Sequence, residues 1–136
     1  MSKYKNKKVE FEGTQFDSKD ECLYYQYLLG LQLQGIIVKI ELQPKVTLIP
    51  KFERNGVRYR ATTYTPDFLV TYTDGSQMYI DVKGFSSQQG ELRKKLFAYK
   101  CDTPLHWVAR SKKYSETGWI GYDDLQRLRR KNKKAV

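Results

Sequence analysis

A first helix is predicted by the spacing of apolar residues in the first quarter of the chain. The stretch CLYYQYLLGLQLQ, which begins at Cys22, carries apolar side chains at helical spacing. Ser18 lies just before it as a candidate N-cap, and Gly35 follows it as a stop signal. The pattern therefore predicts a helix that begins after Ser18 and ends near Gly35.

Short runs rich in β-branched and aromatic residues fill the middle of the chain. IIVKIELQ, KVTLI and FERNGVRYR are separated by Pro44 and Pro50, and the pair Asn55-Gly56 favours a hairpin turn. Residues 64–84 supply two more strands. We therefore predict that the middle of the chain is a series of antiparallel strands.

The last third of the chain returns to helical spacing. SSQQGELRKKLFAYK predicts a second helix with Leu92, Leu96 and Tyr99 on its apolar face. A final strand, PLHWVAR, and a short helix, YDDLQRLRRKNKK, follow. Because no linker or repeat divides the chain, we predict a single α+β domain over residues 1–136, in which a mixed central β-sheet with antiparallel hairpins is flanked by helices.

The hairpin in residues 64–84 determines which side chains lie opposite each other. A three-residue loop from Thr73 to Gly75 suits a turn that ends in a left-handed glycine. In that register Asp67 lies opposite Asp81, and Lys83 lies beside Asp81 on the same face. The apolar residues then share the other face: Phe68, Val70, Tyr72, Met78, Ile80 and Val82.

A two-residue Asp-Gly turn is the alternative, and it would place Asp67 opposite Val82 and break up the apolar face. The three-residue loop is preferred for that reason. It leaves two carboxylates directly opposite each other, which destabilises a sheet unless a shared proton, a lysine or a divalent cation neutralises them. The pair therefore indicates a functional site.

The charge of the chain points to a polyanionic partner. Lys and Arg number 25 against 15 Asp and Glu, which gives a net charge of +10. The basic residues gather in a lead at about residues 1–8, in residues 93–95 and in a tail at about residues 127–136. Nucleic acid is the first candidate partner.

Other residue types narrow the possibilities. Neither a signal peptide nor a lipidation motif accompanies the basic ends, so we expect a cytoplasmic protein without membrane attachment. Cys22 and Cys101 lack zinc-site spacing and are expected to be buried reduced thiols. His106 is the single histidine, which excludes a histidine-pair nuclease; we expect it to pack in or beside the last strand.

Several basic and aromatic side chains are candidate contacts to nucleic acid. Tyr64 and Trp107 are candidates for base stacking. The predicted second helix supplies the candidate phosphate contacts, Arg93, Lys94, Lys95 and Lys100.

The acidic hairpin resembles a known signature. Pro66-Asp67, followed by Asp81-Val82-Lys83, resembles the motif of the PD-(D/E)xK nuclease superfamily. LQPK, YTPDF and IDVKG look like a phage-encoded branch described as resolvase-like or transposon-end-nuclease-like. The resemblance covers about residues 16–110 and implies a restriction-endonuclease-like core.

The resemblance also implies roles for individual residues. Asp67, Asp81 and Glu21, with the Val82 carbonyl, would hold Mg²⁺ or Mn²⁺, and Lys83 would orient a water or neutralise developing charge. Because Ser18 precedes it by three residues, Glu21 is also a candidate for a capping box, in which its carboxylate bonds the start of its own helix.

Gln43 matches a polar position that often lines such sites and would hold a water or phosphate. The alternative is a glutamine that simply lies beside the turn at Pro44.

Two functions remain open. The resemblance implies a Mg²⁺-dependent endodeoxyribonuclease that acts on branched DNA such as a Holliday junction, in phage DNA recombination or processing in a bacterial host cell. Symmetric cutting would require a homodimer, for which Tyr24, Tyr25 and Tyr27 or the stretch GWIGY offer a surface, although core packing explains them equally well. The alternative is a non-catalytic DNA-binding or recombination accessory protein on the same fold.

Overall fold

The computed structural model describes residues 8–135, so most of the predicted basic lead and Val136 lie outside the described residues. The first half of the chain contains β1 (Val9–Phe11), β2 (Thr14–Phe16), α1 (Lys19–Leu33), β3 (Ile37–Leu42), β4 (Val46–Ile49), β5 (Phe52–Arg54), β6 (Val57–Tyr59) and β7 (Thr62–Tyr64). The second half contains β8 (Phe68–Tyr72), β9 (Gln77–Val82), α2 (Gln88–Lys100), β10 (Leu105–Arg110), β11 (Trp119–Gly121) and α3 (Tyr122–Ala135). The predicted α+β class is confirmed.

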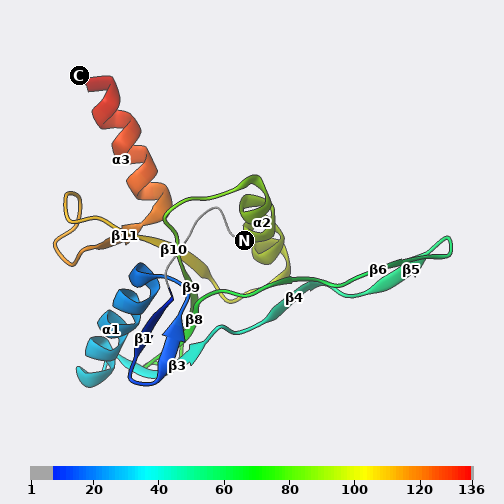
Figure 1. Ribbon diagram of the computed structural model, residues 1–136, viewed down its shortest axis with the longest axis horizontal. Helices are drawn as coiled ribbons and strands as arrows, with labels where there is room; N and C mark the ends of the chain where they lie inside the picture. Colours follow the sequence, from blue (N-terminus) through cyan, green and yellow to red (C-terminus); the bar gives the residue numbers. More distant parts are fainter. Residues whose placement is uncertain (1–7, 136) are drawn as a thin grey trace.

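A mixed five-stranded sheet forms the centre, in the order β11-β10-β9-β8-β3 (Figure 1). β9 and β10 run parallel, because the chain between them crosses through α2, and the other neighbours are antiparallel. The predicted hairpin register is confirmed. Phe68 pairs with Ile80, the Tyr72 N–H donates to the Ser76 carbonyl at 2.8 Å, and Gly75 adopts a φ of 89°.

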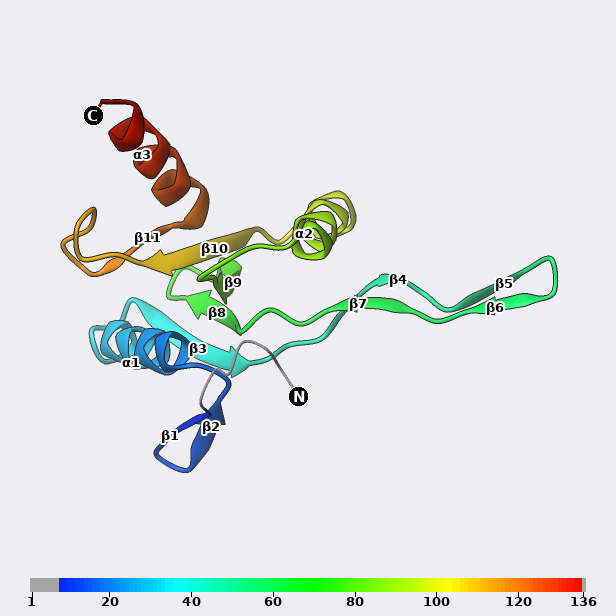
Figure 2. The ribbon, with the colours of Figure 1, turned by 45° about the horizontal axis from the view of Figure 1, so that its top comes forward.

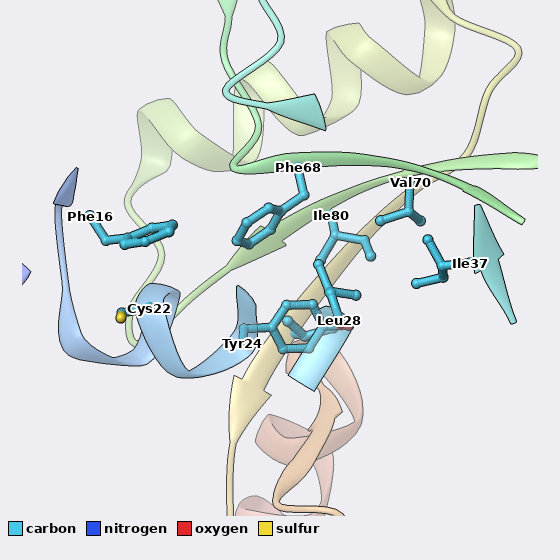
Figure 3. Close-up of a cluster of buried hydrophobic side chains, with 9 residues drawn as sticks. Phe16, Cys22, Tyr24, Leu28, Ile37, Phe68, Val70 and Ile80 are labelled. Atoms are coloured by element: carbon cyan, nitrogen blue, oxygen red, sulfur yellow. The ribbon is translucent and has the colours of Figure 1, made fainter. Parts of the chain in front are cut away.

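The main core lies between α1 and one face of this sheet (Figure 3). Ser18 caps α1 as predicted, and its side chain accepts from the Glu21 N–H. Phe68 and Val70, which are both fully buried, project from β8 toward Tyr24 and Leu28 of the helix. The predicted apolar face of the hairpin therefore packs as expected. Cys22 is buried in this core and Cys101 is half-buried, and both are free thiols.

The predicted apolar face of α2 is wrong for Leu92 and Tyr99, whereas Leu96 packs against a core cluster. Leu92 is 54% exposed and Tyr99 is 92% exposed, whereas Phe97 is buried at 1%. The Phe97 ring lies edge-on to the rings of Tyr64 and Tyr79, at centroid distances of 5.8 and 5.1 Å. Contact with β4 and β10 therefore sets the rotation of the helix, and the large aromatic ring rather than the aliphatic spacing decides which face is buried.

PLHWVAR forms a strand as predicted, β10, and His106 lies exposed in it, but this strand is not the last one. β11 follows and pairs antiparallel with β10. Trp119 of β11 lies edge-on to the ring of Tyr24 at 4.8 Å, and Tyr24 is buried. Core packing therefore accounts for Tyr24 and for part of the GWIGY stretch. No dimer surface is needed to explain them.

Besides β11, three other short strands were not predicted. β1 and β2 form a hairpin through Glu12 and Gly13, which both have positive φ, and β7 pairs with β4. The β4–β7 pair continues outward into the β5–β6 hairpin, which projects far from the sheet (Figures 1 and 2). α3 packs on β10 through Leu125, and its basic residues are exposed. Among residues 8–135, no helix is long and apolar enough to cross a membrane.

Candidate active site

The two predicted aspartates meet at one end of the central hairpin. Asp67 directly precedes β8, and Asp81 lies near the end of β9 with only 5% of its surface exposed. The Val82 N–H donates to Asp67 Oδ2 at 2.8 Å, and the Asp67 carboxyl lies near that of Asp81. The strand register thus places the acids as the sequence predicted.

A chain of side-chain hydrogen bonds orients Asp81. The Tyr64 hydroxyl donates to Asp81 Oδ2 at 2.5 Å, and Trp107 Nε1 donates to that hydroxyl oxygen at 3.0 Å. Burial, followed by the charge of Asp81, raises the pKa of Tyr64, so the tyrosine stays protonated and remains a donor.

The prediction that Tyr64 and Trp107 stack on bases is wrong for this structure. They are 7% and 3% exposed, so neither ring presents a face to a base. Each aromatic body packs in a core cluster, and its polar tip is used in the hydrogen-bond chain to Asp81.

Lys83 is the basic group nearest the acids. Its Nζ lies 3.0 Å from Asp81 Oδ2 and 4.9 Å from the centroid of the Trp107 ring. With 24% of its side chain exposed, the ammonium is fixed beside Asp81 while one side still faces solvent. This geometry suits a cation that contacts a negatively charged substrate.

Glu21 reaches the same site from the first turn of α1. Its backbone N–H donates to Ser18 Oγ at 3.1 Å, which forms one half of the capping box. Its carboxyl is only 5% exposed and lies near the side chains of Gln43 and Asp67. The structure therefore turns the Glu21 carboxyl toward the acids, whereas the backbone of Glu21 serves the cap.

Gln43 is held in an unusual conformation beside the acids. It lies directly after β3 with a φ of 49°, a region that L-residues other than glycine seldom adopt. Its N–H donates to the Asp67 carbonyl at 2.9 Å, and its side chain lies near the Glu21 carboxyl. Local strain of this kind gathers at functional sites, and here it places an amide at the predicted polar position.

Crowding of the acids changes their protonation. Burial, then the charges of Asp81 and Glu21, raises the pKa of Asp67 to about 9. Burial, then the charges of Asp17 and Asp81, raises the pKa of Glu21 to about 7. The site therefore holds protons near neutral pH that a bound cation would displace.

The donor atoms suit a hard divalent cation. Three carboxyls and the Val82 carbonyl offer oxygen ligands, which Mg²⁺ and Mn²⁺ prefer, and a cation would relieve the repulsion that raises the pKa of Asp67. Within residues 8–135, no three His, Cys, Asp or Glu side chains already surround one point as metal ligands would. In this structure the three carboxyls lie near one another, and Asp81 contacts Lys83 and Tyr64.

The four candidate phosphate contacts of α2 separate into two pairs. Arg93 Nε donates to the Thr63 carbonyl at 3.3 Å, and Lys94 Nζ lies 2.7 Å from Asp123 and 4.4 Å from the Trp107 ring centroid. These two side chains connect α2 to β7 and α3. Lys95 and Lys100 are exposed on the outer surface of α2, so the four residues do not form one patch.

A cleft of about 310 Å³ adjoins the site. It is lined by Ser18, Lys19 and Asp20 at the start of α1 and by Val82 and Gly84 at the end of β9. Gly84 has no atom within contact distance of the position where a Cβ would lie, so the chain presents open space there. Val82, which follows Asp81, therefore lies between the cleft and the candidate site.

Residues 1–116 match the family described as a protein of unknown function, DUF1064, and the chain therefore belongs to that family. The match spans every residue of the candidate site. The comparisons with curated proteins and with solved structures found no match.

Because the pKa values of Glu21 and Asp67 are raised, we expect the free energy of unfolding without metal to fall as pH rises. A carboxyl whose pKa is higher in the folded than in the unfolded protein stabilises the fold at low pH. This stabilisation is complete below the unfolded pKa of about 4, and it is lost as the pH rises to the folded pKa. For Glu21 and Asp67 the folded values are about 7 and 9. Asp67→Asn, which needs no proton, should melt several degrees above the unmodified protein at pH 9 and close to it at pH 5.

Thermal unfolding in EDTA across pH 5 to 9 tests this expectation. Asp102→Asn, at an exposed position between α2 and β10, is the matched control and should follow the unmodified protein at every pH. Identical pH profiles for Asp67→Asn and the unmodified protein would show that Asp67 is already ionised at neutral pH.

Proposed function

We propose that this protein is a divalent-metal-dependent DNA endonuclease that hydrolyses phosphodiester bonds. One observation supports the proposal above all, namely that three acids and a lysine from separate segments meet at one end of the sheet. They are Glu21 from α1, Asp67 just before β8, Asp81 from β9 and Lys83 just after β9. Buried acids with raised pKa values beside a fixed lysine are characteristic of catalytic sites.

The residues of the chain have separable roles in this proposal. Asp67, Asp81, Glu21 and the Val82 carbonyl would hold Mg²⁺ or Mn²⁺, which supplies charge stabilisation and lowers the pKa of a bound water. Lys83, held by Asp81 and Trp107, neutralises negative charge on the scissile phosphate or orients a water. Tyr64 keeps Asp81 Oδ2 in a fixed orientation.

The substrate in this proposal is DNA, with branched DNA such as a Holliday junction preferred. The net charge of +10 favours a nucleic-acid partner. The preference for junctions is supported by the resemblance to phage resolvase-like nucleases, which also suggests a homodimer that acts in DNA recombination or processing in the cytoplasm of a bacterial host.

The test is a cleavage assay with labelled four-way junction, linear duplex and single-stranded DNA, each with Mg²⁺, Mn²⁺ or EDTA. We expect metal-dependent cutting of the junction. Cutting of every substrate would support endonuclease activity but contradict the preference for junctions. Tight binding with no cutting in any metal would refute the proposed enzymatic activity.

A DNA-binding accessory protein without catalysis is the second candidate. It is favoured by the state of Asp81, whose Oδ2 is already bonded to Lys83 and Tyr64. In that case the acids and the lysine would be structural groups, and replacement of Asp81 would leave salt-sensitive DNA binding unchanged or stronger.

A further inference from the structure

The β5–β6 hairpin and its flanks form an arm, defined as residues 49–61, that extends from the body of the molecule (Figures 1 and 2). Every residue of the arm is exposed. Its two strands pair only with each other, in a two-stranded sheet of their own. The arm thus contributes no residue to the hydrophobic core clusters of residues 8–135.

Local interactions hold the arm in shape. The Asn55-Gly56 turn has positive φ at both positions, 53° and 77°, as a tight two-residue hairpin requires. Phe52 and Tyr59 face each other across the strands, with ring centroids 4.8 Å apart and an interplanar angle of 13°. The stacked pair is still 44% and 47% exposed, so much of its apolar surface faces solvent.

The arm carries an excess of positive charge. It carries one acid, Glu53, against four basic residues, Lys51, Arg54, Arg58 and Arg60. Among residues 8–135, only Arg58 pairs with that acid, at 3.6 Å, and this ion pair is highly exposed. Basic side chains interleaved with exposed aromatic rings on a narrow ribbon match the chemistry of nucleic acid.

We propose that the arm binds duplex DNA by lying in a groove, with its basic side chains on the flanking phosphates. A two-stranded ribbon fits the major groove, which is about 12 Å wide. A second copy of the chain is a poorer partner, because it carries the same net charge of +10. The inference rests on the proposed function for the identity of the polyanion, and it places the contacts outside the candidate active site.

The arm is connected directly to that site. Its second strand leads into β7, which ends at Tyr64, the donor to Asp81. Arg93 of α2 fixes β7 through the carbonyl of Thr63. DNA held along the arm would therefore approach the acids along a path set by β4 and β7.

The test compares two double variants that each remove two positive charges. Arg54→Gln/Arg60→Gln alters the arm and leaves the Arg58–Glu53 ion pair in place. Lys112→Gln/Lys113→Gln alters exposed residues in the loop before β11, on the other side of the body from the arm (Figure 1). Anisotropy of a fluorescein-labelled duplex in EDTA, over a range of NaCl concentrations, gives Kd and its salt dependence without cleavage.

We expect the arm variant to bind about tenfold more weakly and to lower the slope of log Kd against log salt by about 2, as loss of two phosphate contacts requires. The control should bind within about twofold of the unmodified protein. Equal weakening in both variants, or none in the arm variant, overturns the inference. A lower oligomeric state of the arm variant in sedimentation, with unchanged DNA affinity, also overturns it and makes the arm an interface between copies.

This design separates failure of the inference from failure of the proposed function. If the protein cuts DNA with metal but the arm variant binds DNA normally, the proposed role of the arm is refuted and the proposed nuclease activity stands. If binding depends on the arm but no metal supports cleavage, the nuclease activity is refuted and the role of the arm stands.

Discussion

Asp81→Asn should reduce metal-dependent DNA cleavage by about 10³-fold or more, a loss of the size seen when a group that stabilises transition-state charge is removed. The variant keeps the shape of the side chain, and its amide oxygen can still accept from the Tyr64 hydroxyl. It loses the charge that holds Lys83 at 3.0 Å and that would bind a cation. Single-turnover cleavage with Mg²⁺ measures this effect.

Asp74→Asn is the matched control for this substitution. Asp74 lies in the loop at the opposite end of the same hairpin, exposed, where its Oδ1 accepts from the Ser76 N–H and hydroxyl. An asparagine oxygen can accept the same bonds, so cleavage should be unchanged. Equal cleavage by Asp81→Asn and Asp74→Asn would place the chemistry elsewhere in the molecule.

DNA affinity measured in EDTA distinguishes the enzyme from the accessory protein. For the enzyme, Asp81→Asn abolishes cutting while duplex affinity is unchanged or a few-fold tighter, because a negative charge near the phosphates is removed. For the accessory protein, the unmodified chain already fails to cut, and the substitution changes affinity alone. Circular dichroism of the variant confirms that the loss of the Lys83 ion pair has not unfolded the site.

The part of the site that lies on one hairpin could be predicted from the sequence. Strand side chains alternate, and only the three-residue loop that ends in Gly75 keeps the apolar residues on one face, so the approach of Asp67 to Asp81 follows from local rules. Ser18 and the capping pattern likewise located the start of α1. Local geometry alone determines these features.

The other parts of the site and of the fold could not be predicted, because they depend on contacts between distant parts of the chain. Trp107 reaches Asp81 through Tyr64 only because β10 joins the sheet parallel to β9, a pairing that no local pattern specifies. The position of Tyr64 three residues before Asp67 was one available signal that the tyrosine belongs to the site. It did not show whether the ring was buried. β11 was missed for a similar reason, since three residues give little periodicity and only pairing with β10 makes them a strand.

Phe68→Ala should destabilise the protein by about 4 kcal/mol, a large share of the stability of an ordinary domain. The Phe68 side chain is fully buried and lies parallel to the ring of Tyr25 at a centroid distance of 6.2 Å. Its removal leaves a cavity between β8 and α1 that the sheet cannot fill. Phe52→Ala is the matched substitution on the arm, where the ring is 44% exposed, and it should cost about 1 kcal/mol or less.

Urea unfolding followed by circular dichroism measures both substitutions. Activity is the wrong measure of stability here, because Phe68 directly follows Asp67 in the chain and a looser β8 would also move the candidate site. A similar shift of the midpoint for the two variants would contradict the fold, since it would mean that the aromatic ring on β8 is no more buried than the ring on the arm. A large shift for Phe68→Ala alone supports a core formed by α1 and the sheet, with the arm outside it and free to bind a partner.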